Sequence, residues 1–395
     1  MALEGGLLGG GTGGGTGGGT GGGTGGGTGG GTGGGTGGGT GRLASPSVYS
    51  DEFAAPVYAE AIVRNRGAII DLGDKSFREL EQRTLATGNA HLMRWDPWVR
   101  SYLVAQELVD CMTFKVEVTN DVMTVGLSFS LPDGSGPFPG VKIVRPRQDA
   151  FEKQLEKVMY WAELREERMP EILTQIEGQN CFWGSIVPIQ TDRMRHTREL
   201  LDAAVQFAVF AEMRFKHEFA CWRPIDLSPQ VQPMITTPGH GAFPSGHCTQ
   251  SFAIFEVLKV LLKTTNGTAQ ANAFNLQFQR LATRVSTNRV IAGVHFPIDN
   301  IAGRFLGTVL GQFFSHVAAA PAIDRWMIGT FDGAKLEGSE EFLPNVKFLP
   351  KGSPDAPKYY TVDSWDKPPP VAREGKLREL WIKARKECED LRLVF

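Results

Sequence analysis

Two histidines seven residues apart enclose a Pro-Ser-Gly corner in the segment HGAFPSGHCT, residues 240–249. Pro244 is favourable at the start of a helix, and Ser245 places a hydroxyl beside it. Gly246 leaves its backbone N–H open, so a tetrahedral oxyanion could bind at the N-terminus of the helix that follows. His247 could then exchange a proton with an anion oxygen near neutral pH. Taken alone, the tetrapeptide is more often a common helix start followed by a hydrogen-bonded core histidine.

A second candidate group is the pair of cations in the segment KHEFACWRP. Lys216 and Arg223 are seven residues apart, which is two helical turns, so we expect them on one helix face about 10 Å apart along the axis. Their long side chains could converge on one anion. Pro224 disfavours helical geometry at Arg223 and is expected to end the helix there. In isolation, such a pair is more often a solvated face that assists the helix dipole.

The third group lies in the segment NRVIAGVHFPIDN. Arg289 and His295 are six residues apart, about 120° around a helix, a difference that an arginine side chain can close. Gly293 keeps the surface between them low. Asp299 follows His295 by four residues and is suited to hold one imidazole nitrogen while the other faces a site. A local hydrogen-bonded His–Asp pair is the simpler interpretation of these two residues alone.

Together, KHEFACWRP, PSGH and RVIAGVHFPID resemble the superfamily of vanadium-dependent haloperoxidases and type 2 phosphatidic acid phosphatases. The pattern of that family is Lys-x6-Arg-Pro, then Pro-Ser-Gly-His, then Ser-Arg-x5-His-x3-Asp. The residues that match it in order are Lys216, Arg223, Pro224, Pro244, Ser245, Gly246, His247, Arg289, His295 and Asp299. Asn288 stands where the family usually has serine, a departure that leaves the anion ligands intact but could alter the orientation of Arg289.

The resemblance implies a cage that holds the oxygens of vanadate or phosphate, formed by Lys216, Arg223, Ser245, the Gly246 amide and Arg289. In the haloperoxidases, the histidine that matches His295 binds vanadium directly, and the one that matches His247 assists hydrogen peroxide in the oxidation of a halide. In the phosphatases, His295 would instead be the nucleophile, oriented by Asp299, and His247 would protonate the leaving group.

We expect a soluble vanadate-dependent haloperoxidase that oxidises bromide or iodide with hydrogen peroxide and halogenates a small organic substrate. His240 matches the position where bromide-oxidising relatives carry histidine and chloride-oxidising relatives carry phenylalanine, although a histidine between two glycines is also compatible with an ordinary loop. The length of chain before Lys216 is typical of the haloperoxidases. Two alternatives remain: a soluble phosphomonoesterase with a phospho-histidine intermediate, and a non-catalytic oxyanion-binding relative.

The elements that must position these residues are expected to be mainly helical. Apolar residues recur at helical spacing over 51–66, 75–88, 95–112, 149–176, 192–219, 245–263, 269–295, 297–319 and 373–393. Side chains alternate as in β-strands on both sides of Thr119-Asn120-Asp121, which predicts a β-hairpin with its turn there. The expected fold is therefore a mainly α helical bundle of the vanadium haloperoxidase and acid phosphatase type, with a minor β-hairpin.

Four segments are expected from the distribution of these patterns along the chain. Residues 1–41 are a GGGT-repeat tether, expected to be disordered because it has no apolar surface to bury. Residues 42–190 form an N-terminal helical half with the hairpin, and 191–330 form the catalytic helical bundle. Residues 331–395 provide a Pro-rich connector and a C-terminal helix.

The composition of the chain predicts which classes of partner it binds and in which compartment it lies. The 395 residues carry a formal net charge of -2 and are 41% hydrophobic, which gives no indication of nucleic-acid binding. The start lacks the basic and apolar regions of a signal peptide, so a cytoplasmic location is expected. The most apolar stretch, 298–320, is interrupted by charged residues, so no membrane span is predicted. Five cysteines without a Cys-x-x-Cys pair are expected to be reduced and mostly buried, and the chain to form a homo-oligomer.

Overall fold

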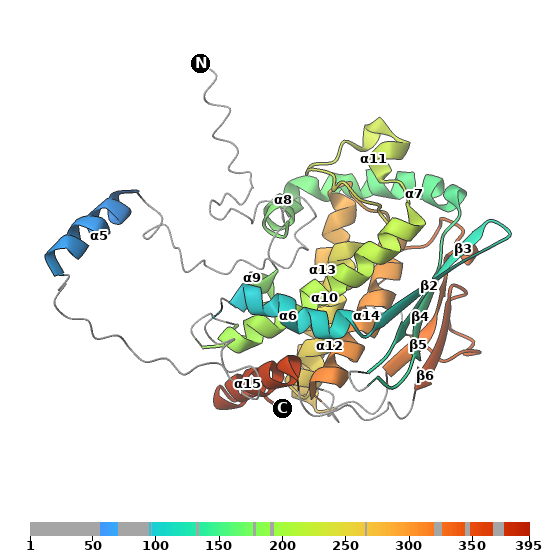
Figure 1. Cartoon of the computed structure of the whole chain (residues 1–395). Helices are drawn as coiled ribbons and strands as arrows, with labels where there is room; N and C mark the ends of the chain where they lie inside the picture. The colour runs from blue at the N-terminus through green and yellow to red at the C-terminus, as the bar shows by residue number, and fades with distance from the viewer. Residues whose placement is uncertain are drawn as a thin grey trace, which may run out of the picture. The chain divides into compact units, whose positions relative to one another are not determined.

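Four long helices, α10, α12, α13 and α14, form the centre of the computed structural model (Figure 1). The residues that the structure describes are 56–69, 95, 97–131, 134–176, 179–189, 193–264, 267–319, 326–343, 348–365 and 375–395. The α-helices are α5 (Pro56–Ile69), α6 (Pro97–Val109), α7 (Gln148–Trp161), α8 (Arg165–Thr174), α9 (Asn180–Trp183), α10 (Arg195–Phe219), α11 (Pro224–Leu227), α12 (Gly246–Leu261), α13 (Ala269–Ile291), α14 (Pro297–Ala319) and α15 (Lys376–Asp390). Short 3-10 turns are η2 (Ala162–Leu164), η3 (Pro229–Val231) and η4 (Gly333–Lys335).

Helices α12 and α14 make the closest contact in the bundle. Every residue of α14 except Gln312 is buried, as expected for a helix that is apolar around its circumference. The contact uses glycines spaced four residues apart, Gly303, Gly307 and Gly311. A Cβ atom placed on Gly307 would lie 2.3 Å from the carbonyl oxygen of Thr249 on α12. The absence of side chains at these positions therefore lets the two helix backbones approach each other.

A five-stranded sheet packs along one side of the helices (Figure 1). Its strands are β2 (Met112–Thr119), β3 (Val122–Phe129), β4 (Phe138–Val144), β5 (Trp326–Asp332) and β6 (Tyr360–Trp365), in the order β2-β3-β4-β5-β6. The expected hairpin is β2-β3, and Asn120 and Asp121 in its turn have φ angles of 51° and 64°. Neighbouring strands are antiparallel except β4 and β5, which are parallel.

The expectation of only a minor hairpin was wrong because most of the sheet depends on distant pairing. Val141 on β4 pairs with Gly329 on β5, across a connection that contains the whole helical bundle. Pro139 and Gly140 also interrupt the alternation of β4, and both residues are depleted in strands. Local periodicity therefore gave no signal for β4, β5 or β6.

Most of the expected helices are present, with differences at their ends. The predicted helix 149–176 is divided into α7 and α8 by the turn η2. The predicted helix 269–295 ends at Ile291, whereas the one predicted over 297–319 has these bounds in the structure. The expected tether 1–41 and the expected helix 75–88 lie outside the described residues.

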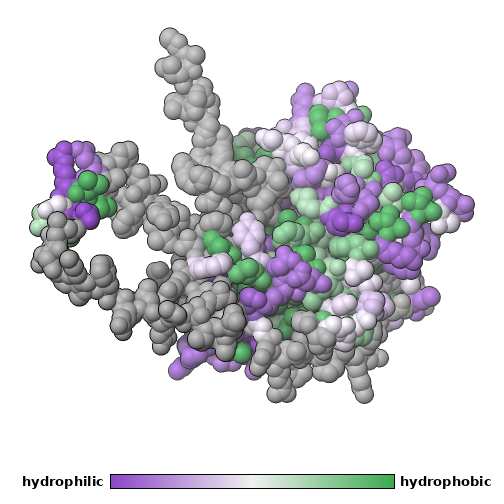
Figure 2. Space-filling view, viewed as in Figure 1, coloured by the Kyte–Doolittle hydropathy of each residue, from purple (hydrophilic) through white to green (hydrophobic). Residues whose placement is uncertain are grey.

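The described residues from Ser101 to Phe395 form one compact unit, and α5 belongs to another unit, in which residues 60–69 are exposed. The segment boundaries expected after residues 190 and 330 stay predictions. Figure 2 shows polar and apolar residues interspersed over one face. None of the helices in the described part of the chain combines the length and apolar character needed to cross a bilayer. Four of the five cysteines are buried and free, as expected, while Cys181 is exposed.

Candidate functional site

The N-terminus of α12 is the first component of the site. Ser245 is the N-cap residue, with extended backbone, and its N–H donates to the carbonyl oxygen of Asp299 at 2.9 Å. This bond joins the start of α12 to the start of α14. The Ser245 hydroxyl is buried and has no hydrogen-bond partner in the described chain. The first amides of α12 have no acceptor within the helix either, because a helix leaves its first N–H groups unpaired.

Gly246 is the first residue of α12 and lies next to the buried side chain of Glu212, which no sequence motif indicated. A Cβ atom on Gly246 would lie 2.6 Å from Oε1 of Glu212, so glycine is required for this close approach. Glu212 lies on α10, one turn before Lys216, and is 1% exposed. Its Oε1 accepts a hydrogen bond from Nε2 of Gln250 at 3.0 Å, while Oε2 has no partner among the described residues. The spacing of four between Glu212 and Lys216 is the sequence signal that could have identified it.

Lys216 lies in the last turn of α10 and binds the loop that leads into α12. Its Nζ donates to the carbonyl oxygens of Gly241 at 3.1 Å, Ala242 at 3.2 Å and Pro244 at 2.6 Å. An ammonium group has three N–H donors, so in this structure all of them are engaged by the loop. Lys216 therefore orders the approach to α12 and supplies positive charge beside it.

Arg223 does not lie on the same helix as Lys216, contrary to the expectation from their spacing. Helix α10 ends at Phe219, and Ala220 takes a left-handed conformation with a φ angle of 46°. Arg223 has extended backbone and precedes the short helix α11, where its N–H donates to Oδ2 of Asp226 at 2.8 Å. Pro224 is the first residue of α11, so the chain has already turned before the proline.

The Arg223 guanidinium nevertheless reaches the site and joins two of the predicted histidines. Nη1 donates to the carbonyl oxygen of Val294 at 2.6 Å and lies 3.1 Å from Nε2 of His295. Nε donates to the carbonyl oxygen of His240 at 3.0 Å, and Nη2 lies 3.1 Å from Nδ1 of the same residue. His240 is half-buried and lies at the edge of this group.

His295 and Asp299 form the pair that their spacing predicted. Nδ1 of His295 lies 2.9 Å from Oδ2 of Asp299, an oxygen that also accepts the N–H of Phe296 at 2.9 Å. The carboxylate accepts, so Nδ1 carries the proton and Nε2 carries the lone pair that faces Arg223. Burial raises the pKa of Asp299, and burial with the charge of Arg223 lowers the pKa of His295.

Arg289 and His295 come from different elements, contrary to the expectation of one helix. Helix α13 ends at Ile291 and carries Arg289 in its last turn. Gly293 then turns the chain with a φ angle of 82°, a left-handed conformation that glycine adopts without strain. His295 therefore lies in the connection between α13 and α14, after the turn that follows Arg289.

Arg289 is a buried cation with N–H groups that no described residue accepts. It is 1% exposed, and Nη2 donates to the carbonyl oxygen of Ile172 at 3.1 Å and to Oε1 of Gln175 at 3.3 Å. Its Nε and Nη1 have no hydrogen-bond partner in the described chain. Asn288, at the one position that departs from the family pattern, donates to the same Gln175 oxygen at 2.9 Å. Asn288 thus acts on Arg289 through Gln175, a residue that no sequence motif indicated.

His247 is a buried, neutral imidazole. Its Nε2 lies 2.8 Å from the backbone oxygen of Gln175, so Nε2 carries the proton and Nδ1 the lone pair. Burial and the nearby charge of Arg289 lower the pKa of His247 to about 3. In this environment the ring stays neutral at physiological pH.

Electrostatics favour an anion at this site. Burial removes three cations of the site from water and so lowers their pKa values. The pKa of Lys216 is lowered, that of Arg223 falls to about 10 and that of Arg289 falls to about 9. Burial also raises the pKa of Glu212. Buried charge without a partner is costly, and an anion would offset that cost. Orphaned donors on Ser245 and Arg289, together with the N-terminus of α12, match the several acceptor oxygens of a tetrahedral oxyanion.

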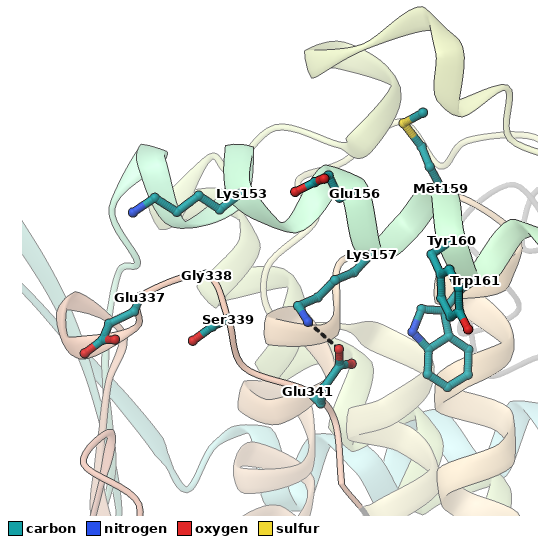
Figure 3. Close-up of a pocket in the computed structure, with 10 residues that line it drawn as sticks. All are labelled: Lys153, Glu156, Lys157, Met159, Tyr160, Trp161, Glu337, Gly338, Ser339 and Glu341. Carbon is teal, nitrogen blue, oxygen red and sulfur yellow. Dashed lines mark hydrogen bonds and ion pairs between the residues drawn. The ribbon is translucent and has the colours of Figure 1, made fainter.

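The structure thus brings together all the residues that the sequence singled out, and we call the group the cage. Its members are Lys216, Arg223, His240, Ser245, Gly246, His247, Arg289, His295 and Asp299. A separate open pocket of about 850 Å³ lies between α7 and residues 337–341 (Figure 3). It contains no cage residue, and Lys157 and Glu341 form an ion pair in it. Because this ion pair compensates two of the charges in the pocket, whereas the cage has buried donors without a partner among the described residues, the cage is the better candidate site.

Comparisons with known proteins locate a domain over the same part of the chain. Residues 201–321 match the model of the PAP2 superfamily and so carry a PAP2 domain, which includes every cage residue. No curated protein matches the sequence. Among solved structures, the chain is similar to the transmembrane PAP2-type phosphatidylglycerolphosphate phosphatase from Bacillus subtilis, at 20% sequence identity and a TM-score of 0.34. That similarity covers 42% of this chain and 85% of the phosphatase.

Proposed function

We propose that the cage binds vanadate and that the protein is a haloperoxidase, which oxidises bromide or iodide with hydrogen peroxide and so halogenates a small organic substrate. The observation that carries the proposal is the set of buried, unsatisfied donors on Ser245 and Arg289, next to the histidine pair of the cage. A buried N–H or O–H without an acceptor is costly, so these donors favour a ligand with several acceptor oxygens. Vanadate and phosphate share this chemistry.

The donors of the cage would bind the oxygens of the anion, and an imidazole would bind vanadium. Arg289 and Ser245 would hold oxygens of the anion, and Nε2 of His295 would be the protein ligand to vanadium. Vanadate, when bound there, would supply the Lewis acid that activates hydrogen peroxide towards a halide. Asp299 keeps the proton on Nδ1 of His295 and so directs the Nε2 lone pair into the cage. Arg223, which donates to that lone pair in this structure, would turn a donor to the anion instead.

His247 is the candidate group for proton transfer in either reaction. Its lone pair is on Nδ1, and its lowered pKa keeps the ring neutral at physiological pH. The Nδ1 lone pair of a neutral imidazole can accept a hydrogen bond from hydrogen peroxide. The phosphatase reaction would need the same ring protonated, and the negative charge of a bound phosphate would favour that form by offsetting Arg289.

His240 would bias the choice of halide. Its ring is half-buried and lies 3.1 Å from Nη2 of Arg223, so it reaches the edge of the cage. An imidazole can hydrogen-bond an incoming halide or peroxide, whereas a phenyl ring cannot. Bromide and iodide are easier to oxidise than chloride, so we expect good turnover of the first two and poor turnover of chloride.

A phosphomonoesterase is the second candidate, and the match of residues 201–321 to the PAP2 superfamily favours it. In that reaction the lone pair of His295 would attack phosphorus, and the ester oxygen would leave with a proton from His247. A third possibility, a non-catalytic oxyanion-binding relative, would bind vanadate or phosphate without turnover.

One experiment separates the three. Metal-free protein is supplied with vanadate, and bromination of a phenolic dye by bromide and hydrogen peroxide is followed against an equal concentration of free vanadate. Hydrolysis of p-nitrophenyl phosphate is followed in parallel without vanadate. Vanadate-dependent bromination above the free-vanadate rate supports the haloperoxidase. Ester hydrolysis without bromination establishes the phosphatase instead, and anion binding without either activity establishes the non-catalytic relative.

A further inference from the structure

A second buried arginine outside the cage lacks a counter-ion. Arg304 on α14 is 7% exposed and forms no ion pair with any residue that the structure describes. Its Nε has no hydrogen-bond partner in the described chain, and Nη1 reaches only the carbonyl oxygen of Leu343, at 3.5 Å. Burying an unpaired guanidinium is costly, as it is for Arg289 in the cage. Arg304 therefore has the same electrostatic need for an anion.

Two aromatic rings contact the Arg304 guanidinium. The ring centroids of Phe252 and Phe348 lie 5.6 Å and 4.6 Å from its Cζ atom, in cation–π contact. The N–H groups of a guanidinium point outward in its plane, away from a ring that contacts its face. A planar carboxylate can accept two of these in-plane hydrogen bonds at once.

Arg304 lines a pocket of about 520 Å³ that has no residue in common with the cage. Apolar side chains on its wall include Phe255, Trp326 and Leu349. The pocket lies along α12 and α14 beyond their N-termini, where Phe252 follows His247 by five residues, or about 7.5 Å along the helix axis. It is therefore a separate site with an apolar wall and one buried cation.

The other charges in this pocket are already matched. The Glu256 carboxylate accepts hydrogen bonds from Nζ of Lys259 at 2.9 Å and 3.0 Å. Arg304 thus supplies the uncompensated charge, and Glu256 would repel a ligand that carries two or more negative charges. A single carboxylate on an apolar body fits this distribution better than a phosphate does.

We propose that this pocket binds a small organic monocarboxylate, whose carboxylate group pairs with the edge of Arg304 and whose apolar body contacts Phe255, Trp326 and Leu349. The site is independent of the reaction in the cage. It would be occupied whether the cage performs halide oxidation, ester hydrolysis or neither.

Calorimetric titration of the full chain with benzoate and with benzamide tests the proposal. The two probes have the same ring and similar size, but only benzoate carries a charge. Benzoate should bind with saturation and at least about tenfold more tightly, because hydrogen bonds to charged groups are stronger than neutral ones. No saturable binding of benzoate, or equal affinity for the two probes, would overturn the proposal.

Variants at the rim locate the binding site without removing the arginine. Leu349 is half-buried, so Leu349→Asp places a negative charge in the pocket, and Leu349→Asn is its neutral control. Leu349→Asp should weaken benzoate binding at least about fivefold relative to Leu349→Asn. Arg304→Met should abolish the preference for benzoate over benzamide, while Arg289→Gln in the cage should keep it. Equal benzoate affinity in the two Leu349 variants, or loss of binding only in Arg289→Gln, would contradict the assignment.

Discussion

A single methyl group at Gly307 should disturb both the packing of the bundle and the cage. The Cβ of Gly307→Ala would lie 2.3 Å from the carbonyl oxygen of Thr249, and 3.0 Å from two further backbone atoms of that residue. These atoms belong to α12, so no side chain can move aside. Restoring an ordinary contact of about 3.4 Å requires the helix backbones to separate by about 1 Å.

The size of the effect follows from that displacement. Overpacking a well-packed core typically costs about 1 to 3 kcal/mol of folding free energy. The same shift would act on the bond between the Ser245 N–H and the Asp299 oxygen, which is 2.9 Å long and joins the starts of α12 and α14. A misplacement of about 1 Å in a catalytic group can lower the rate about 100-fold. We therefore expect a loss of stability together with a much larger relative loss of turnover.

Urea unfolding gives the change in stability, and vanadate-dependent bromination gives the change in rate. Gly239→Ala is the matched control, because a Cβ atom there meets nothing within 4 Å and the φ angle is not in the left-handed region. The control should stay within about 0.5 kcal/mol of the wild type. If Gly307→Ala is as stable and as active as Gly239→Ala, the close packing of α12 on α14 does not position the cage.

Three further substitutions test individual residues of the site. Glu212→Gln should be more stable than the wild type at pH 8 and similar to it at pH 4. Burial raises the pKa of Glu212, so the cost of ionising its carboxylate in the folded state appears as the pH rises. Urea unfolding across pH measures this difference. His247→Ala should retain vanadate, as equilibrium dialysis would show, but lose about 100- to 10,000-fold in turnover, and equal loss of binding would refute the separation of roles. His240→Phe should lower the ratio of bromide to chloride turnover in steady-state halogenation of one dye. Unchanged ratios would show that His240 does not affect the choice of halide.

The motifs identified most of the cage because the chemistry was local to each of them. The His295–Asp299 pair is four residues apart and needed only a short turn to form. The backbone between cage residues was harder to predict: Ala220 and Gly293 turn the chain with positive φ angles, so two expected helical spacings were wrong. The motifs did not indicate the residues that reach the cage through tertiary packing. Gln175 comes from the end of α8 and contacts both His247 and Arg289, yet no spacing links it to them.

The sheet shows the same limit at the level of the fold. The β2-β3 hairpin was predictable because its strands alternate and its turn is two residues long. The pairing of β4 with β5 depends on residues that are nearly 190 positions apart, such as Val141 and Gly329. Helices were more accessible to prediction because their hydrogen bonds are local, and α14 matched its expected bounds at both ends.

The most direct test of the central proposal is vanadate-dependent bromination by the wild type and by His295→Ala. Both proteins are loaded with equal vanadate, vanadate binding is measured by dialysis, and dye bromination is compared with that of free vanadate at the same concentration. We expect the wild type to bind vanadate and to brominate well above the free-vanadate rate, while His295→Ala stays folded but loses tight binding and activity. Bromination by His295→Ala at the wild-type rate, or wild-type bromination no faster than free vanadate, would contradict the account.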